Sequence, residues 1–232
     1  MTEHITPDEA WKQALQPHLA HKEIYRHGEK LELAFYEAIN RGETDKMRYL
    51  LEQGLPHLFS ASRPLHTAAR TDNKETLALL LEWGEDINGC DAFGNSPLCE
   101  AVLNGCLQAI DFLIQQGADP HVFCYDQMNA SIPVPGRPLL RQAVEWGFGW
   151  WPNQPEQVQK LSAGLACLFD RLPALLPEWK AFNDEMYRIY KLPDKGRQWC
   201  RLVAEALRQR GRTDLANLLL PNESKHPGDS EL

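Results

Sequence analysis

The chain has no long run of Lys or Arg. Its 232 residues carry 24 basic against 32 acidic side chains, a formal net charge of −8. A protein that tracks a phosphate backbone needs clustered cations, so the composition argues against nucleic acid as a direct ligand. The surplus of carboxylates instead favours a basic protein as partner.

Long apolar runs are also missing. The first residues, MTEHITPDEAW, contain neither a cationic segment nor the apolar core of a cleaved leader, and no apolar stretch approaches bilayer length. We therefore expect no membrane association. The expected location is the cytoplasm, with export without a cleaved signal as the alternative.

The six cysteines form no C-x-x-C pair and have no paired spacing to a histidine, which argues against zinc and redox motifs. Reduced thiols are the expectation, because a disulfide would require an oxidising compartment. A nucleophile with a base, a paired-carboxylate site and a phosphate-binding Gly loop are absent as well. The sequence thus predicts no metal, no cofactor and no enzymatic activity.

What the sequence does have is an internal repeat between residues 62 and 120. Four positions recur after 33 residues: Pro64 and Pro97, Ala68 and Ala101, Leu80 and Leu113, Gly84 and Gly117. A fixed period of this length is typical of stacked helical repeats. A more degenerate copy over 31–58 precedes them, with Gly42 at its helix–helix turn.

The repeated residues predict how each helix pair begins and ends. Pro64 and Pro97 suit the first helical turn, with the hydroxyls of Ser62 and Ser96 placed to cap it. Gly84 and Gly117 follow Leu-rich helices, and we expect them in the left-handed conformation. Small Ala residues on the first helix allow close stacking of neighbouring repeats.

The Pro-Leu-His-x-Ala of residues 64–68 and the Asp91-x-x-Gly94-x-x-Pro97-Leu98 of the next copy resemble the ankyrin repeat. The resemblance implies an all-α fold, an ankyrin-like helical solenoid of about 4–5 repeats. Helical caps and two loop insertions in the fourth repeat complete the expected architecture. The expected parts are an N-terminal helical cap at 1–28, three repeats at 29–122, a fourth repeat with long insertions at 123–172, an irregular helix with a C-terminal capping repeat at 173–220, and a disordered tail at 221–232.

Beyond residue 122 the pattern departs from the family. The finger loop FCYDQMNASIPVPGRP and the segment GFGWWPNQP interrupt the fourth repeat, before a helix expected at 156–170. Their large amphipathic side chains are of the types enriched at protein interfaces. The alternative is that these rings fold back and seal the stack. In 173–220, Asp194-Lys195-Gly196 is expected to be a repeat-entry turn, and Trp199, Leu202, Val203, Ala206 and Leu207 an apolar helical stripe.

Members of the family characteristically bind other proteins through finger tips and the inner helices of a concave face. Carried over position by position, the resemblance places partner contacts in one finger, at three inner-helix ends and in the fourth repeat. Phe93, Leu103 and Trp146 are expected to be an exposed apolar row. Tyr125, Trp150 and Trp151 are added because they lie in the two inserted segments. The expected contact residues are Arg41, Arg70, Thr71, Phe93, Asn95, Leu103, Asn104, Tyr125, Glu145, Trp146, Trp150 and Trp151.

The resemblance implies a non-enzymatic interaction module, expected to be a monomer when free. We expect it to inhibit or sequester a specific protein, in the sharpest form as an immunity-type neutraliser of a basic bacterial toxin. An effector or adaptor acting on a host protein is the first alternative. An enzyme with its site in 123–195 is the second, and His66 has a weaker case for catalysis than for bridging loops.

Overall fold

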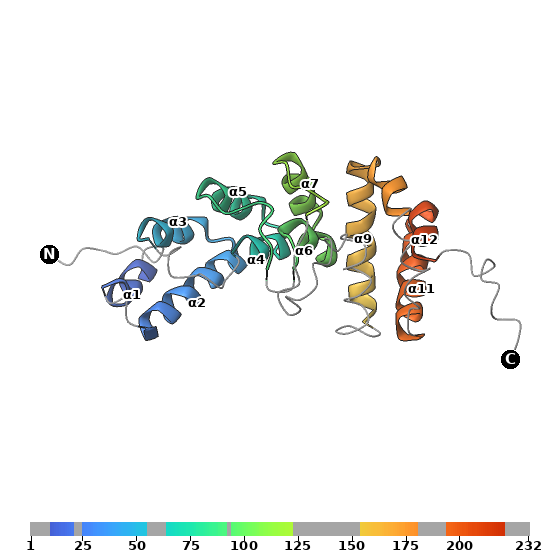
Figure 1. Cartoon of the computed structure of the whole chain (residues 1–232). Helices are drawn as coiled ribbons and strands as arrows, with labels where there is room; N and C mark the ends of the chain where they lie inside the picture. Colours follow the sequence, from blue (N-terminus) through green and yellow to red (C-terminus); the bar gives the residue numbers. More distant parts are fainter. Residues whose placement is uncertain are drawn as a thin grey trace, which may run out of the picture. The chain divides into compact units, whose positions relative to one another are not determined.

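The computed structural model (Figure 1) describes residues 10–20, 25–54, 64–91, 94–122, 154–180 and 194–220, with the backbone alone at 25–29 and 194–195. All regular elements within these ranges are helices. The contacts divide the chain into two compact units, Met1–Asp86 and Ile87–Leu232.

The first unit is a set of helices in two layers. Helix α1 packs on α2, which packs on α3 and α4; α5 packs on both α3 and α4. One layer is thus α2 with α4 and the other is α3 with α5 (Figure 1). The helices are α1 (Ala10–Leu19), α2 (Tyr25–Arg41), α3 (Thr44–Glu52), α4 (Pro64–Arg70) and α5 (Lys74–Glu82).

The core of the first unit lies between these layers. Phe35 and Ile39 of α2, Met47 of α3 and Leu77 of α5 are almost completely buried. Ala68 is fully buried on α4, at a position where a larger side chain would keep the helices apart. This confirms the small-residue positions that the repeat pattern predicted.

The turns follow the glycine pattern. Gly42 links α2 to α3 with a φ of 68°, and Gly84 follows α5 with a φ of 90°. Both lie in the left-handed region that favours glycine. Gly117 has a φ of 86° in the second unit, so the expectation for both repeat glycines is confirmed.

Helix α1 buries one side chain. Leu15 is buried, whereas Ala10 and Ala14 are exposed. Helix α2 begins at Tyr25, so it runs across the expected boundary between 28 and 29. Gly28 therefore lies inside a helix.

The second unit is built around a long helix, α9. This helix packs on α6 and α7 on one side and on α11 on the other, and α11 packs on α12. Residues 175–180 form a further helical turn, where Trp179 meets Phe169 of α9 edge to face at 5.0 Å between ring centroids. The helices are α6 (Pro97–Asn104), α7 (Leu107–Gln115), α9 (Pro155–Arg171), α11 (Asp194–Gln209) and α12 (Thr213–Leu219).

Helix α6 begins as its sequence predicts. Pro97 is its first residue, and the Ser96 hydroxyl accepts a hydrogen bond from the Cys99 amide at 3.2 Å. Before it, the Asp91 carboxylate accepts from the Asn95 amide at 2.9 Å, and Gly94 has a φ of 81°. The Gly94 amide also donates to the Asp91 carbonyl at 3.0 Å, so Asp91 binds two residues just before α6.

Helices α6 and α9 approach each other closely at two glycines. A Cβ added to Gly164 of α9 would lie 2.1 Å from the Val102 carbonyl oxygen, and one added to Gly105 would lie 2.5 Å from the Lys160 carbonyl oxygen. The Gln157 side-chain amide also donates to the Leu103 carbonyl at 2.7 Å. Backbone therefore meets backbone along this contact.

The C-terminal helix pair corrects two expectations. Residues 194–196, expected as a turn, form the start of α11. Leu202, expected in the apolar stripe, is 40% exposed, while Trp199, Val203 and Leu207 of that stripe are buried. The buried face of α11 is therefore narrower than the predicted apolar stripe, because it leaves Leu202 out.

The cysteines also differ in part from expectation. Cys99, Cys106, Cys167 and Cys200 are thiols outside any disulfide. Cys90 is disulfide-bonded, so the expectation of reduced thiols is wrong for this residue.

Candidate protein-interaction surface

Three of the expected contact residues lie at helix ends of the first unit. Arg41 is the last residue of α2 and Arg70 the last of α4, and both are exposed. The Arg41 guanidinium lies 3.7 Å from the Glu43 carboxylate. Thr71 is half-buried, and its hydroxyl donates to the Ala68 carbonyl at 2.8 Å. The structure thus presents two cations at equivalent helix ends, with Thr71 engaged in its own turn.

Two expected contact residues of the second unit are buried instead. Leu103 is 2% exposed, so its expected place in an exposed apolar row is wrong. The physical reason is α9, which packs on α6 and binds the Leu103 carbonyl through Gln157. Asn95 is fully buried, with its amide donating to the Glu100 carboxylate at 2.8 Å, so it holds the start of α6 together.

Asn104 is the last residue of α6 and is half-buried. Its side-chain amide donates to the Glu100 carbonyl at 2.8 Å, one turn earlier in the helix. Near it, burial raises the pKa of the Cys99 thiol well above its usual range, and the carboxylates of Glu100 and Asp91 add to this. The thiol is thus kept protonated, which argues against a nucleophile at this place.

The other expected contact residues lie outside the described residues. They belong to one finger and to the fourth repeat. Whether the aromatic side chains of the fourth repeat contact a partner or seal the stack stays a prediction. These residues are Phe93, Tyr125, Glu145, Trp146, Trp150 and Trp151.

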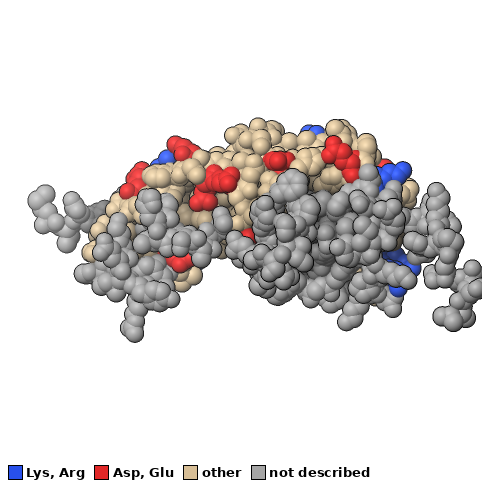
Figure 2. Space-filling view, in the orientation of Figure 1, with Lys and Arg blue, Asp and Glu red and all other residues tan. Residues whose placement is uncertain are grey.

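The layer of α3 and α5 carries exposed carboxylates that the expected contact set did not include. Figure 2 shows acidic side chains gathered over these two helices. The exposed cations of both helices are Arg48 and Lys74, and the Arg48 guanidinium lies 3.8 Å from the Glu82 carboxylate. Exposed carboxylates outnumber these two: they are Asp45, Glu52, Glu75 and Glu82. This layer therefore has a negative surplus.

At the end of α5 the structure adds an exposed aromatic ring. Trp83 is 41% exposed, whereas Trp179 and Trp199 are buried. Aligning the repeats could have revealed it, because Trp83 stands where the neighbouring copies have Gln53 and Gln116. The resemblance did not indicate Trp83, because this position falls outside the family's usual contact positions.

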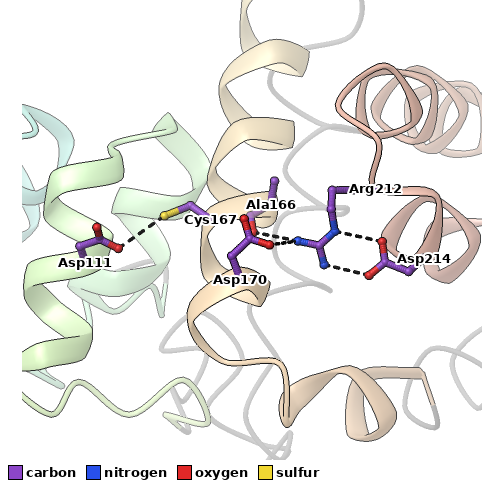
Figure 3. Close-up of polar contacts among 6 residues, drawn as sticks. All are labelled: Asp111, Ala166, Cys167, Asp170, Arg212 and Asp214. Atoms are coloured by element: carbon purple, nitrogen blue, oxygen red, sulfur yellow. Dashed lines mark hydrogen bonds and ion pairs between the residues drawn. The ribbon is translucent and has the colours of Figure 1, made fainter.

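Charged contacts tie α7 to α9 and α9 to α12, and Figure 3 shows those of Arg212. The Arg171 guanidinium donates to both carboxylate oxygens of Asp111, at 2.6 and 2.7 Å. Arg212 donates to both oxygens of Asp214, at 3.0 and 2.8 Å, and also reaches the Asp170 carboxylate and the Ala166 carbonyl on α9. These contacts fix helices rather than present a ligand site.

Cys167 lies beside one of these pairs, on α9. Its sulfur is 3.7 Å from the Asp111 carboxylate (Figure 3). Burial raises the pKa of this thiol to about 11, and the negative charge of Asp111 contributes further. The thiol is therefore neutral near pH 7.

Among the described residues, no group of three or more His, Cys, Asp or Glu side chains is placed to hold a metal ion. Within the same part of the chain, no helix has the length and apolar character to cross a membrane.

Comparison with known proteins now gives the class. The family model for ankyrin repeats (3 copies) matches residues 34–124, which include α3 to α7. Residues 34–124 are thus ankyrin repeats in an all-α fold, and ankyrin repeats act as protein–protein interaction modules.

Two curated relatives each match about a third of this chain. The B-cell lymphoma 3 protein homolog of Mus musculus is 38% identical over 87 residues, which is 36% of this chain and 19% of that protein. Cyclin-dependent kinase 4 inhibitor B of Mus musculus is 35% identical over 75 residues, 32% of this chain and 55% of that protein. The chain thus matches only part of each relative's length.

Proposed function

We propose that this protein binds one specific basic protein and inhibits or sequesters it, without an enzymatic activity of its own. In its sharpest form the partner is a basic toxin that the chain neutralises. The chain acts as a stoichiometric binder, a monomer until it meets its partner. Neither nucleic acid nor membrane takes part.

The observation that carries this proposal is the surplus of exposed carboxylates on α3 and α5. These two helices carry four exposed carboxylates and two exposed cations, and the whole chain has a net charge of −8. Such a surface speeds the encounter with a basic partner and disfavours acidic ones. The printed name of one relative, an inhibitor of a kinase, supports an inhibitory mode.

The test is capture of the partner from native cell extract on the immobilised full chain, at low and at raised salt. The expected result is one stoichiometric basic protein whose retention falls as salt rises, because exposed charges are screened. The captured protein is then purified and its own activity is titrated with the chain. Loss of that activity at a one-to-one ratio is expected.

A charge-reversed variant serves as the control. Glu75→Lys with Asp45→Lys changes two exposed carboxylates on the α3–α5 layer and leaves the core intact. We expect slower association, by about tenfold or more at low salt. A partner that is acidic, or that binds this variant as fast as the natural chain, would refute the proposal.

A further inference from the structure

The three repeats end their second helix in the same backbone geometry. The cap residues Gln53, Trp83 and Gln116 have φ and ψ of −79° and 3°, −84° and 4°, and −83° and 3°. Each donates its amide to the carbonyl four residues earlier, at 3.2, 3.1 and 3.0 Å. Because two copies achieve this with glutamine, the fold does not require an indole at position 83.

The Trp83 ring is also available to a ligand. It is 41% exposed. In the part of the chain that the structure describes, no aromatic ring and no cation stacks on it, although Lys12 does lie over the rings of Trp11 and Tyr49. A large, partly exposed aromatic ring that the fold does not require is a typical anchor for a partner.

The residues around this ring are acidic. Residues 82–86 read EWGED, so three carboxylates and no cation stand within five positions. Glu82 and Asp86 are exposed, and the Glu82 carboxylate lies 3.8 Å from Arg48 at the edge of the α3–α5 layer. An indole face attracts cations, and nearby carboxylates strengthen that preference.

We propose that this Trp83 surface, residues 82–86, binds an arginine side chain of the basic partner. This inference rests on the proposed function and names its contact. A guanidinium is planar, so it stacks on an indole while its N–H groups donate to a carboxylate in a fork, which an ammonium group does not do. The negative charge of residues 82–86 is complementary to the positive charge of an arginine.

The experiment uses the full chain labelled with nitrogen-15 and a capped peptide of alternating Gly and Arg. The Trp83 indole N–H resonance is identified by its loss in Trp83→Gln, which copies the neighbouring repeats. We expect the arginine peptide to shift this resonance saturably. Matched peptides with Lys or Glu in place of Arg should shift it less, the Glu peptide least.

Affinity is measured separately by fluorescence anisotropy with the labelled arginine peptide. Trp83→Gln should raise the dissociation constant about three- to fivefold, the loss expected for an exposed cation–π contact. Gln53→Ala, at the equivalent cap of the preceding repeat, should leave it unchanged.

Three results would overturn the inference: a Trp83 resonance that does not move with the arginine peptide, one that moves equally with the lysine or glutamate peptide, or an unchanged affinity in Trp83→Gln. Each would leave the proposed function standing if a basic partner is still captured. Conversely, a responsive Trp83 with no basic partner in extract would refute the proposed function alone.

Discussion

Replacing Gly164 by alanine tests the close contact between α6 and α9. The added Cβ would lie 2.1 Å from the Val102 carbonyl oxygen, 2.8 Å from its carbonyl carbon and 2.9 Å from its Cα. All three are backbone atoms, so no side-chain rotation relieves the overlap. Restoring ordinary contact requires the helices to separate by roughly 1 Å or more.

The size of the effect follows from opposing contributions. Overpacking of this kind costs about 1–3 kcal/mol, and separation endangers the 2.7 Å bond from Gln157 to the Leu103 carbonyl, worth about 1 kcal/mol. Alanine gains about 1 kcal/mol over glycine in helix propensity. The overlap outweighs this gain, so we expect Gly164→Ala to lower the free energy of unfolding by about 2 kcal/mol.

The assay is urea unfolding followed by far-UV circular dichroism. The control is Ala163→Gly, the preceding residue of α9, which should cost only about 1 kcal/mol through propensity. If Gly164→Ala is as stable as the natural chain or more stable, the helices do not approach as described. Leu103 would then not be covered by α9 in the way described above.

Four further predictions concern single residues. Ser96→Ala removes the cap of α6 and should cost about 1 kcal/mol in the same urea assay, and Ala101→Leu should overpack a fully buried position at about 1–3 kcal/mol. The Arg212 guanidinium holds the pKa of Asp214 below its usual range in the folded chain. The pair therefore stabilises the fold at pH values above the pKa that Asp214 has in the unfolded chain. This stabilisation is lost as the pH falls through the lower pKa of the folded chain. Asp214→Asn should therefore flatten the acid side of a melting-temperature profile taken between neutral pH and about pH 3. With a pKa of about 11, the Cys167 thiol should react with iodoacetamide at pH 8 far more slowly in the folded chain than in urea, as measured by peptide mass spectrometry.

The repeat framework could be predicted because its signals are local. Pro97 after Ser96 marks a helix start, and Gly84 and Gly117 mark helix ends through a backbone conformation that few other residues adopt. These residues act within one turn of the chain. Their meaning therefore does not depend on distant segments.

The contact residues could be predicted less well, because exposure depends on what arrives from elsewhere. Leu103 is covered by α9, whose Gln157 lies 54 positions later in the sequence. Leu202 fits an apolar stripe by spacing, yet lies outside the face that its neighbours cover. Trp83 was not predicted because it lies outside the family's usual contact positions, yet it is 41% exposed.

The glycines between α6 and α9 also limit how this scaffold can be engineered. Ankyrin arrays are commonly lengthened by adding units, each of which buries the face of the last. Here a 17-residue helix lies on both α6 and α7, with backbone seated on backbone at Gly105 and Gly164. A generic repeat inserted after α7 would bring side chains to those places and displace α9. The face of α6 and α7 is thus tailored to one neighbour, and a longer designed version would have to grow from another point in the chain.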